Sequence, residues 1–219
     1  LALVSEGVSV SEHHVRKLMR EHGLLARRPR SKGCTRAGVR DVRCGNLVKN
    51  VCPQGPDMVW VADTTQFFAG GARLYLSVVM DLFSRQVVGW SLSRRNDEDL
   101  VRRSLCKALE SRHPGSGWIH HSDQGSTYLA KGYVGFIRSM GGRQSVSAPG
   151  RPQDNAHMES FMRTLKLDEV DRNRYESFAE AHASLQTYIE SIYNKERLHS
   201  SLGYKSPEQF ESRFYGETR

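Results

Sequence analysis

Three carboxylates stand at positions where an α/β protein could build a catalytic site. Asp63 follows the apolar run "VWVA", Asp123 follows "WIHHS", and Glu159 lies in the first turns of a predicted helix. Strand ends and helix starts at one edge of a sheet are where active sites are built. Oxygen ligands without a cysteine or histidine array favour Mg²⁺ or Mn²⁺. The acids therefore predict a site at which two such ions could clamp the attacking and leaving oxygens of a phosphodiester.

Taken singly, each acid has a simpler explanation. An isolated aspartate more often caps or turns the chain than binds a metal. Glu159 and Arg163, four residues apart on a helix, could form a surface ion pair worth only about 0.3–0.5 kcal/mol. Asp81, a fourth acid in "VMDLFSR", is predicted to be structural, either pairing with Arg85 or capping the corner there. The catalytic interpretation rests on three acids acting together.

The hydrophobic pattern predicts the elements that must bring these acids together. Runs rich in β-branched and aromatic residues indicate strands, the first three of them in an antiparallel meander, and helical periodicity indicates the rest. The predicted strands are 58–67, 72–85, 86–93, 117–123 and 143–150, and the predicted helices are 96–112 (with Asn96 as its cap), 128–142, 154–166 and 177–197. The expected fold class is α/β, a mixed sheet with helices on both faces.

The helix predicted over 154–166 carries two stripes. The apolar one has the i, i+3, i+4, i+7 spacing of a face that packs on a core, and consists of Met158, Phe161, Met162 and Leu165. The other is charged and consists of Glu159, Arg163 and Lys166. Docking the apolar stripe on the sheet would aim Glu159 at the two aspartates.

The net charge of +8 is concentrated near the N-terminus. Residues 16–49 hold eleven Lys and Arg against two acids, a local net charge of +9, next to a nearly neutral remainder. Such a segment favours a polyanionic partner, most simply nucleic acid, over a merely solvated tail. It begins with a predicted helix in which Ser9 and Glu12 fit a capping box and Gly23 is placed to end it.

Composition excludes several classes of protein. With 38% hydrophobic and 26% charged residues, and no run of 18 apolar residues, neither disorder nor a membrane span is expected. The opening residues lack an initiator Met and the features of a signal peptide, so we expect a cytosolic protein without its natural N-terminus. Cysteine spacing argues against both disulfides and a zinc module, and predicts reduced thiols at Cys34, Cys44, Cys52 and Cys106.

Five ordered motifs resemble those of a known family. The segments "WVADTTQF", "LYLSVVMDLFSRQVVGWSLS", "HHSDQGSTY", "DNAHMESFMRTLK" and "YNKERLHSSLGYKSPEQF" are similar to motifs of bacterial DDE transposases of the insertion-sequence-three type, whose core is similar to retroviral integrase and ribonuclease H. Asp123 and Glu159 are separated by 35 residues, the spacing typical of this class. The resemblance covers nearly the whole chain. It implies a ribonuclease H-like sheet, three antiparallel strands and then alternating helices and strands, with a small helical N-terminal segment.

The resemblance implies a chemistry for each acid. Asp63 and Asp123 would bridge two Mg²⁺ ions, and Glu159 would complete the ligand shell. Hydrolysis at the element end would free a 3′-hydroxyl, which would then attack another phosphodiester. Arg163 and Lys166 would contact DNA phosphates or terminal bases, and Asn155 is expected on the same face of the helix. Two departures are His157, where the family more often has a small residue or proline, and Thr127, where it commonly has glutamine.

The implied partner is double-stranded DNA, both the terminal repeats of the element and a target. Residues 1–55 would form a partial helical DNA-binding segment with a basic linker containing Arg27, Arg28 and Arg30, and residues 56–219 the integrase-like catalytic core. Two ends must be brought together, so we expect a homodimer or a higher oligomer on DNA, in the cytoplasm and associated with the nucleoid.

Alternative interpretations remain. One is a transposase-derived protein that binds DNA without cutting it, and another is a nuclease of the same fold that cuts without strand transfer. A Ser-His-Asp relay within His120, His121, Ser122 and Asp123 is disfavoured because adjacent residues in a strand point to opposite faces. The C-terminal "YNKERLHSSLGYKSPEQF" is expected to be a packed turn leading into a last helix capped by Ser206, in preference to a nucleic-acid contact.

Overall fold

The computed structural model of this chain describes residues 3, 6–24, 45–49, 51–148 and 151–217. Three arginines of the predicted basic linker, Arg27, Arg28 and Arg30, lie outside the described residues, as do Cys34 and Cys44. The other two cysteines have free thiols, as predicted.

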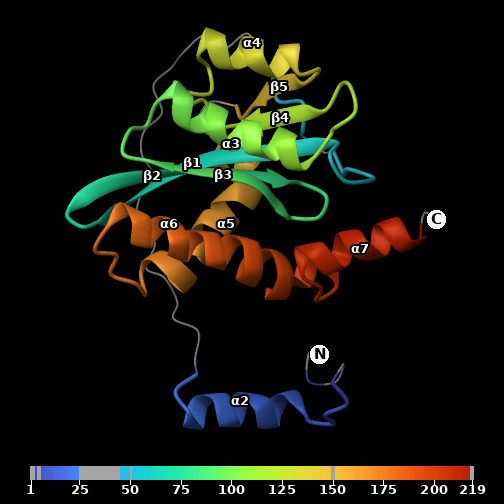
Figure 1. Ribbon diagram of the computed structural model, residues 1–219. Helices are drawn as coiled ribbons and strands as arrows, with labels where there is room; N and C mark the ends of the chain where they lie inside the picture. Colours follow the sequence, from blue (N-terminus) through green and yellow to red (C-terminus); the bar gives the residue numbers. More distant parts are fainter. Residues whose placement is uncertain (1–2, 4–5, 25–44, 50, 149–150, 218–219) are drawn as a thin grey trace.

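Five strands form one mixed sheet (Figure 1). Their order across the sheet is β3-β2-β1-β4-β5; β1, β2 and β3 pair antiparallel, whereas β4 pairs parallel with both β1 and β5. The strands are β1 (Val59–Ala69), β2 (Ala72–Asp81), β3 (Val87–Ser93), β4 (Ile119–Ser122) and β5 (Arg143–Val146). The meander followed by alternating helices and strands confirms the predicted topology.

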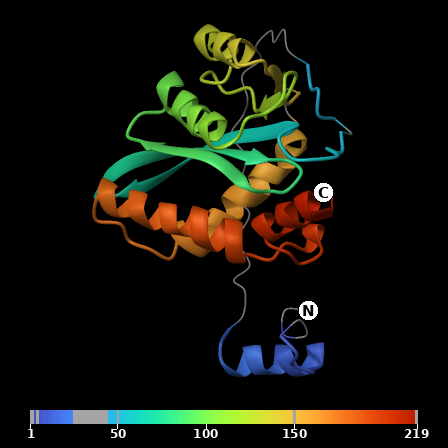
Figure 2. The ribbon, with the colours of Figure 1, turned by 45° about the vertical axis from the view of Figure 1, so that its right-hand side comes forward.

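Helices cover both faces of this sheet, with β1 at its centre (Figures 1 and 2). On one face lie α3 (Glu98–Ser111) and α4 (Lys131–Ser139), and on the other lie α5 (Ala156–Leu165) and α6 (Phe178–Thr187). Two π-helical segments, η2 (Lys166–Val170) and η3 (Tyr188–Glu196), continue α5 and α6, and α7 (Pro207–Glu217) is the last helix. Side chains alternate along β1, so Val61 joins one core and Trp60 the other.

The apolar stripe of α5 packs on the sheet as its spacing predicts. All four of its members are at most 6% exposed: Met158, Phe161, Met162 and Leu165. Burial of a side chain of this size contributes about 1.5–3 kcal/mol. Together they fix the orientation of α5 about its own axis, which determines where its polar residues point.

Two predicted helix caps are wrong by one or two residues. The N-terminal helix α2 (Glu12–Glu21) is capped by Ser11, whose hydroxyl accepts from the backbone N–H of His14 at 3.3 Å, and not by Ser9. Likewise, Asp97 caps α3 in place of Asn96. Ser, Asp and Asn are nearly equal as caps, so the hydrophobic period alone cannot choose between neighbours. No residue of α2 is buried, and the helix stands apart from the sheet in Figures 1 and 2.

Asp81 anchors the corner between β2 and β3. Its side chain is fully buried, and its Oδ1 accepts from the backbone N–H groups of Phe83 at 2.8 Å and Ser84 at 2.9 Å. The other oxygen accepts from the N–H of Asp57 at 2.7 Å. Of the two predicted roles, the corner cap is therefore confirmed, whereas no salt bridge joins Asp81 to Arg85 in the described part of the chain.

The C-terminal motif forms the predicted packed turn. Ser206 is fully buried, and its hydroxyl accepts from the N–H of Gln209 at 3.3 Å at the start of α7. Farther along α7, Glu211 accepts two bonds from Arg112 Nη2, at 2.7 and 2.9 Å, and one from Ser84 at 2.7 Å. These bonds tie the last helix to α3 and to the β2–β3 corner.

Candidate active site

The pairing of β1 with β4 brings Asp63 and Asp123 to the same end of the sheet. Val61 of β1 lies opposite His121 of β4 in the last pair of the parallel register, and each aspartate follows that pair by two residues. Neighbouring strands lie about 4.8 Å apart. The first strand does not end near Asp63 as expected: β1 continues to Ala69 because β2 still pairs with it there. Its parallel pairing with β4 ends after Val61, and that opens the edge beside Asp63.

Asp63 is held in an environment that disfavours its charge. Its pKa is raised from the ordinary 3.8 to about 7, first by burial and then by repulsion from the Asp123 and Glu159 carboxylates. Two groups act in the opposite direction: the backbone N–H of Thr64, which donates to Oδ1 at 2.7 Å, and the positive charge of Lys166. The three acids thus share one electrostatic neighbourhood.

Asp123 lies just beyond β4 on an exposed turn. Its Oδ1 accepts from the backbone N–H of Gly125 at 2.9 Å, and this bond fixes the orientation of the Asp123 carboxylate. A Cβ atom at position 125 would meet the same oxygen at 2.9 Å, closer than real Cβ atoms come. Gly125 therefore allows the close approach of its own backbone N–H to the Asp123 carboxylate.

Glu159 reaches the site from α5, where its side chain is exposed. The start of that helix is tied to β1 by Asn155, whose amide nitrogen donates to the Ala62 carbonyl at 3.1 Å, next to Asp63. Asn155 is only 5% exposed. Asn155 is thus placed to position the start of α5 against β1, while its expected contact with DNA stays a prediction.

The three residues of the charged stripe on α5 differ in their exposure and in their contacts. Arg163 is exposed and forms no salt bridge with Glu159 in the described part of the chain, so the surface ion pair is absent. Lys166, at the junction with η2, is partly buried and lowers the pKa of Asp63. Glu159 is thus free to act with the aspartates, and two cations stand on the same helix.

Thr64 and Tyr128 form a polar support that the sequence analysis missed. The Thr64 hydroxyl and the Tyr128 phenol oxygen lie 3.0 Å apart. In the sequence, Thr64 directly follows Asp63 and Tyr128 comes five residues after Asp123. Tyr128 is 2% exposed, and burial together with the Asp63 charge raises the pKa of its phenol. Only its place in the "HHSDQGSTY" motif hinted at this role.

The two histidines before Asp123 point to opposite faces, as predicted. His120 contacts the Tyr133 hydroxyl at 2.9 Å on the α4 side. His121 contacts the hydroxyls of Ser145 at 2.8 Å and Ser147 at 3.2 Å on the other. Burial lowers the pKa of His120 to about 3 and that of His121 to about 4, so both are neutral near pH 7. They pack the strand and make no nucleophile-base relay.

The acids suit a hard cation in their chemistry. A divalent ion among Asp63, Asp123 and Glu159 would relieve the repulsion that raises the pKa of Asp63. Over residues 3, 6–24, 45–49, 51–148 and 151–217, however, no three His, Cys, Asp or Glu side chains already surround one point as a metal site would require. The exposed carboxylates of Asp123 and Glu159 would therefore have to close on the ion.

Fold and acids together define an integrase-like polynucleotidyl transferase, and comparison with known proteins identifies the family. The chain matches the integrase core domain family over residues 53–152 and again over 140–207. It is 40% identical over 212 residues to the transposase for insertion sequence element IS904 of Lactococcus lactis, spanning 95% of this chain and 83% of that protein. It is 35% identical to transposase InsF for IS3A of Escherichia coli, spanning 96% and 74%. The chain belongs to the IS3-type bacterial transposases.

Solved structures confirm the fold. An intasome of simian T-cell lymphotropic virus, in complex with a PP2A regulatory subunit, superposes with a TM-score of 0.59 at 18% identity over 96% of this chain and 69% of that one. The HTLV-2 integrase catalytic core in complex with magnesium gives 0.51 at 17% identity over 72% and 98%. The BIV integrase core gives 0.53 at 17% identity over 74% and 99%. The sheet is thus ribonuclease H-like.

Among the described residues no helix is both long and apolar enough to span a membrane.

Proposed function

We propose that Asp63, Asp123 and Glu159 are the catalytic carboxylates of this transposase and bind Mg²⁺ or Mn²⁺, two ions in the complete site. The observation that carries the proposal is the electrostatic proximity of the three acids: Asp123 and Glu159 both raise the pKa of Asp63, and the two aspartates each follow the last β1–β4 pair by two residues. The bound metal would polarise the scissile phosphate and neutralise the charge that develops on it.

The residues of the chain would position the reactants. In the first step water adds to phosphorus at the element end and the P–O3′ bond breaks, leaving a 3′-hydroxyl. In the second that hydroxyl adds to a target phosphorus and displaces another 3′-oxygen. The pairing of β1 with β4 just before the two aspartates would keep Asp63 and Asp123 near each other, and the bond from Asn155 to Ala62 would keep Glu159 turned toward them.

DNA contacts would come from two regions. Arg163 and Lys166 follow Glu159 along α5 and would grip phosphates beside the scissile bond. The basic linker, with Arg27, Arg28 and Arg30, would add sequence-independent affinity.

The two-part organisation of the chain also belongs to this proposal. Residues 1–55 would bind DNA through α2 and the linker, and residues 56–219 would form the catalytic core; α2 has no buried residue, and the family match begins at residue 53. Two element ends must be joined, so the active form would be at least a homodimer on DNA, associated with the nucleoid in the cytoplasm.

The test is incubation of the purified chain with a labelled element-end duplex and Mg²⁺ or Mn²⁺. The parent should cleave and join DNA, and Glu159→Gln should lose both activities while it still binds the duplex. Glu110→Gln is the matched control, because Glu110 is an exposed glutamate on α3, across the sheet.

Each other outcome has a definite meaning. Binding without cleavage by the parent would favour a transposase-derived DNA-binding protein, and cleavage without joining would favour a nuclease. Undiminished activity in Glu159→Gln would refute the assignment of Glu159.

A further inference from the structure

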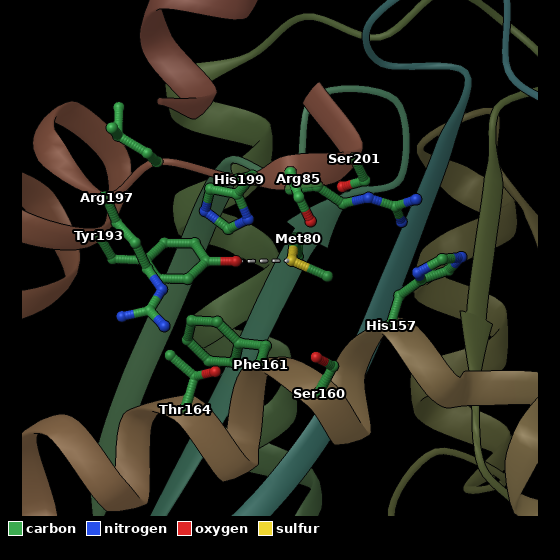
Figure 3. A pocket seen from close by; sticks show the side chains of 12 residues that line it. Met80, Arg85, His157, Ser160, Phe161, Thr164, Tyr193, Arg197, His199 and Ser201 are labelled. Atoms are coloured by element: carbon green, nitrogen blue, oxygen red, sulfur yellow. Dashed lines mark hydrogen bonds between the residues drawn. The ribbon is translucent and has the colours of Figure 1, made fainter. Parts of the chain in front are cut away.

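A second polar site lies on the side of α5 away from the acids. A cavity of about 260 Å³ opens between α5, the β2–β3 corner and the segment that follows η3 (Figure 3). Its polar lining includes Arg85, His157, Ser160, Arg197, His199 and Ser201. Water occupies about 30 Å³ per molecule in the liquid, so the cavity has room for a small ion with part of its hydration shell. We call it the basic pocket.

Aromatic packing makes one wall of the basic pocket rigid. The Tyr193 ring meets the Phe161 ring edge to face with centroids 4.8 Å apart, and the His199 ring with centroids 5.2 Å apart. The Tyr193 hydroxyl donates to the sulfur of Met80, another lining residue, at 3.7 Å (Figure 3). This wall therefore leaves His199 in a fixed position with its ring at the cavity.

The charged residues that line the basic pocket are of one sign. They are Arg85 and Arg197; two histidines also line it, and no Asp or Glu does so in the described part of the chain. Arg197 is paired with Asp168, which leaves Arg85 as the cation without a salt bridge among the described residues. The pKa of His199 is lowered to about 4 by burial and then by the positive charges of Arg197 and Arg85, the pattern expected where no anion is present.

Two nitrogens in the basic pocket have no partner. Arg85 Nη1, a donor, and His199 Nε2, a donor in one of the two neutral tautomers of the ring, are both buried from solvent and lack a hydrogen-bond partner among the described residues. A buried donor left unsatisfied costs about 1–3 kcal/mol, and more when it is charged. Such a cost is unusual in a native protein and is removed if a ligand accepts the bonds.

The backbone conformation at Arg85 is held by the turn between β2 and β3. Arg85 has a φ of 64°, a left-handed conformation that costs a non-glycine residue of order 1 kcal/mol, and the Asp81 carbonyl accepts from its N–H at 2.9 Å. The buried corner cap of Asp81 enforces this turn. From it, the Arg85 side chain extends along the cavity toward His157 (Figure 3).

We propose that the basic pocket binds a phosphate oxyanion, with Arg85 and His199 as principal donors and the hydroxyls of Ser160 and Ser201 at its opening. Tetrahedral oxyanions offer several acceptors to convergent donors, and guanidinium groups match them in geometry. The phosphate can come from a DNA backbone or from free phosphate. The DNA source rests on the proposed function, whereas the free source does not.

The first measurement is isothermal titration of the metal-free full chain with inorganic phosphate at constant ionic strength. The parent should bind it saturably, and Arg85→Gln should weaken binding roughly tenfold or more, since a charge-assisted hydrogen bond is lost. Ser201→Asp, at an exposed position on the rim, should weaken it by charge repulsion and serves if Arg85→Gln does not fold. Arg138→Gln, at an exposed arginine of α4, is the control and should bind as the parent does.

The second measurement separates the two sources. Binding of a fluorescent element-end duplex without metal is followed against salt, and loss of one phosphate contact should reduce the slope of log affinity against log salt by about 1 in both pocket variants. A reduced slope identifies a DNA phosphate; lost phosphate binding with an unchanged slope identifies free phosphate. Unchanged phosphate affinity together with an unchanged slope in both variants would overturn the proposal. Neither measurement depends on DNA cleavage, so failure of the proposed function would be recognised separately.

Discussion

Replacing Asp63 with asparagine should stabilise the metal-free protein above pH 7. In the folded state the pKa of this carboxyl is about 7, against an ordinary value of 3.8. Below about pH 4 the Asp63 carboxyl is protonated in both the folded and the unfolded state, so it does not change the free energy of unfolding. As the pH rises from about 4 to 7, the unfolded state releases the proton while the folded state keeps it, and the free energy of unfolding falls. The loss is complete above pH 7.

The size of the effect follows from the two pKa values. One pKa unit corresponds to 1.36 kcal/mol, so the interval between 3.8 and about 7 corresponds to at most about 4 kcal/mol at pH 8. Asparagine cannot ionise, and its side-chain oxygen can still accept from the Thr64 N–H. For a chain of this length Asp63→Asn should raise the melting temperature at pH 8 by on the order of 10 °C.

Thermal melts from pH 4 to pH 8, with and without Mn²⁺, would measure this. The parent and Asp63→Asn should converge near pH 4 and separate as the pH rises; Mn²⁺ should stabilise the parent and leave the variant unaffected. Asp99→Asn is the control, because Asp99 is an exposed acid on α3 paired only with Arg103. An Asp63→Asn variant no more stable than the parent at pH 8 would refute the electrostatic argument.

Three further substitutions test contacts that hold the helices against the sheet and against one another. Gly89→Ala should destabilise by about 1–3 kcal/mol, because a Cβ there would lie 2.3 Å from a backbone oxygen of α3. Asn155→Ala should cost about 1–3 kcal/mol by leaving the Ala62 carbonyl unsatisfied, and should slow DNA cleavage by loosening α5. Glu211→Ala should cost about 3–5 kcal/mol, because it leaves the buried Arg112 guanidinium without its main partner. Urea unfolding measures all three.

Each of the three has a matched control on the same chain. Gly135→Ala in α4, where a Cβ meets nothing within 4 Å, should be stabilising by roughly 0.5–1 kcal/mol. Asn96→Ala and Glu208→Ala remove exposed side chains and should change stability by less than about 0.5 kcal/mol. If the buried and exposed members of a pair cost the same, the contacts named above do not stabilise the fold.

The predictable part of this fold and site is the part that local pattern encodes. The spacing of Met158, Phe161, Met162 and Leu165 gave both the helix and its buried face, because one helical period decides them. The rule that active sites gather at one sheet edge predicted that the acids would lie near one another, and the effect of Asp123 and Glu159 on the pKa of Asp63 agrees with their proximity. The basic pocket could not be predicted, because Arg85 and His199 are distant in sequence and meet only through tertiary packing.

Asn155 shows a second reason why sequence periodicity could not predict part of the site. Its spacing from Glu159 suggested a shared face, but it precedes α5, at the end of the 3₁₀ turn η1 (Pro152–Asn155), so the helical period does not apply to it. Local propensity cannot show where a helix changes its pitch.

The sheet order also has a consequence for the timing of activity during synthesis. The meander of β1, β2 and β3 is made of neighbouring segments, whereas β4 must cross over α3 to reach β1, and such non-local parallel pairings form late. Asp63 belongs to the early hairpin, Asp123 to the late strand, and Glu159 to a helix encoded later still. A nascent or partly folded chain therefore holds its acids apart. The three carboxylates can therefore act together only in a chain that has completed its sheet.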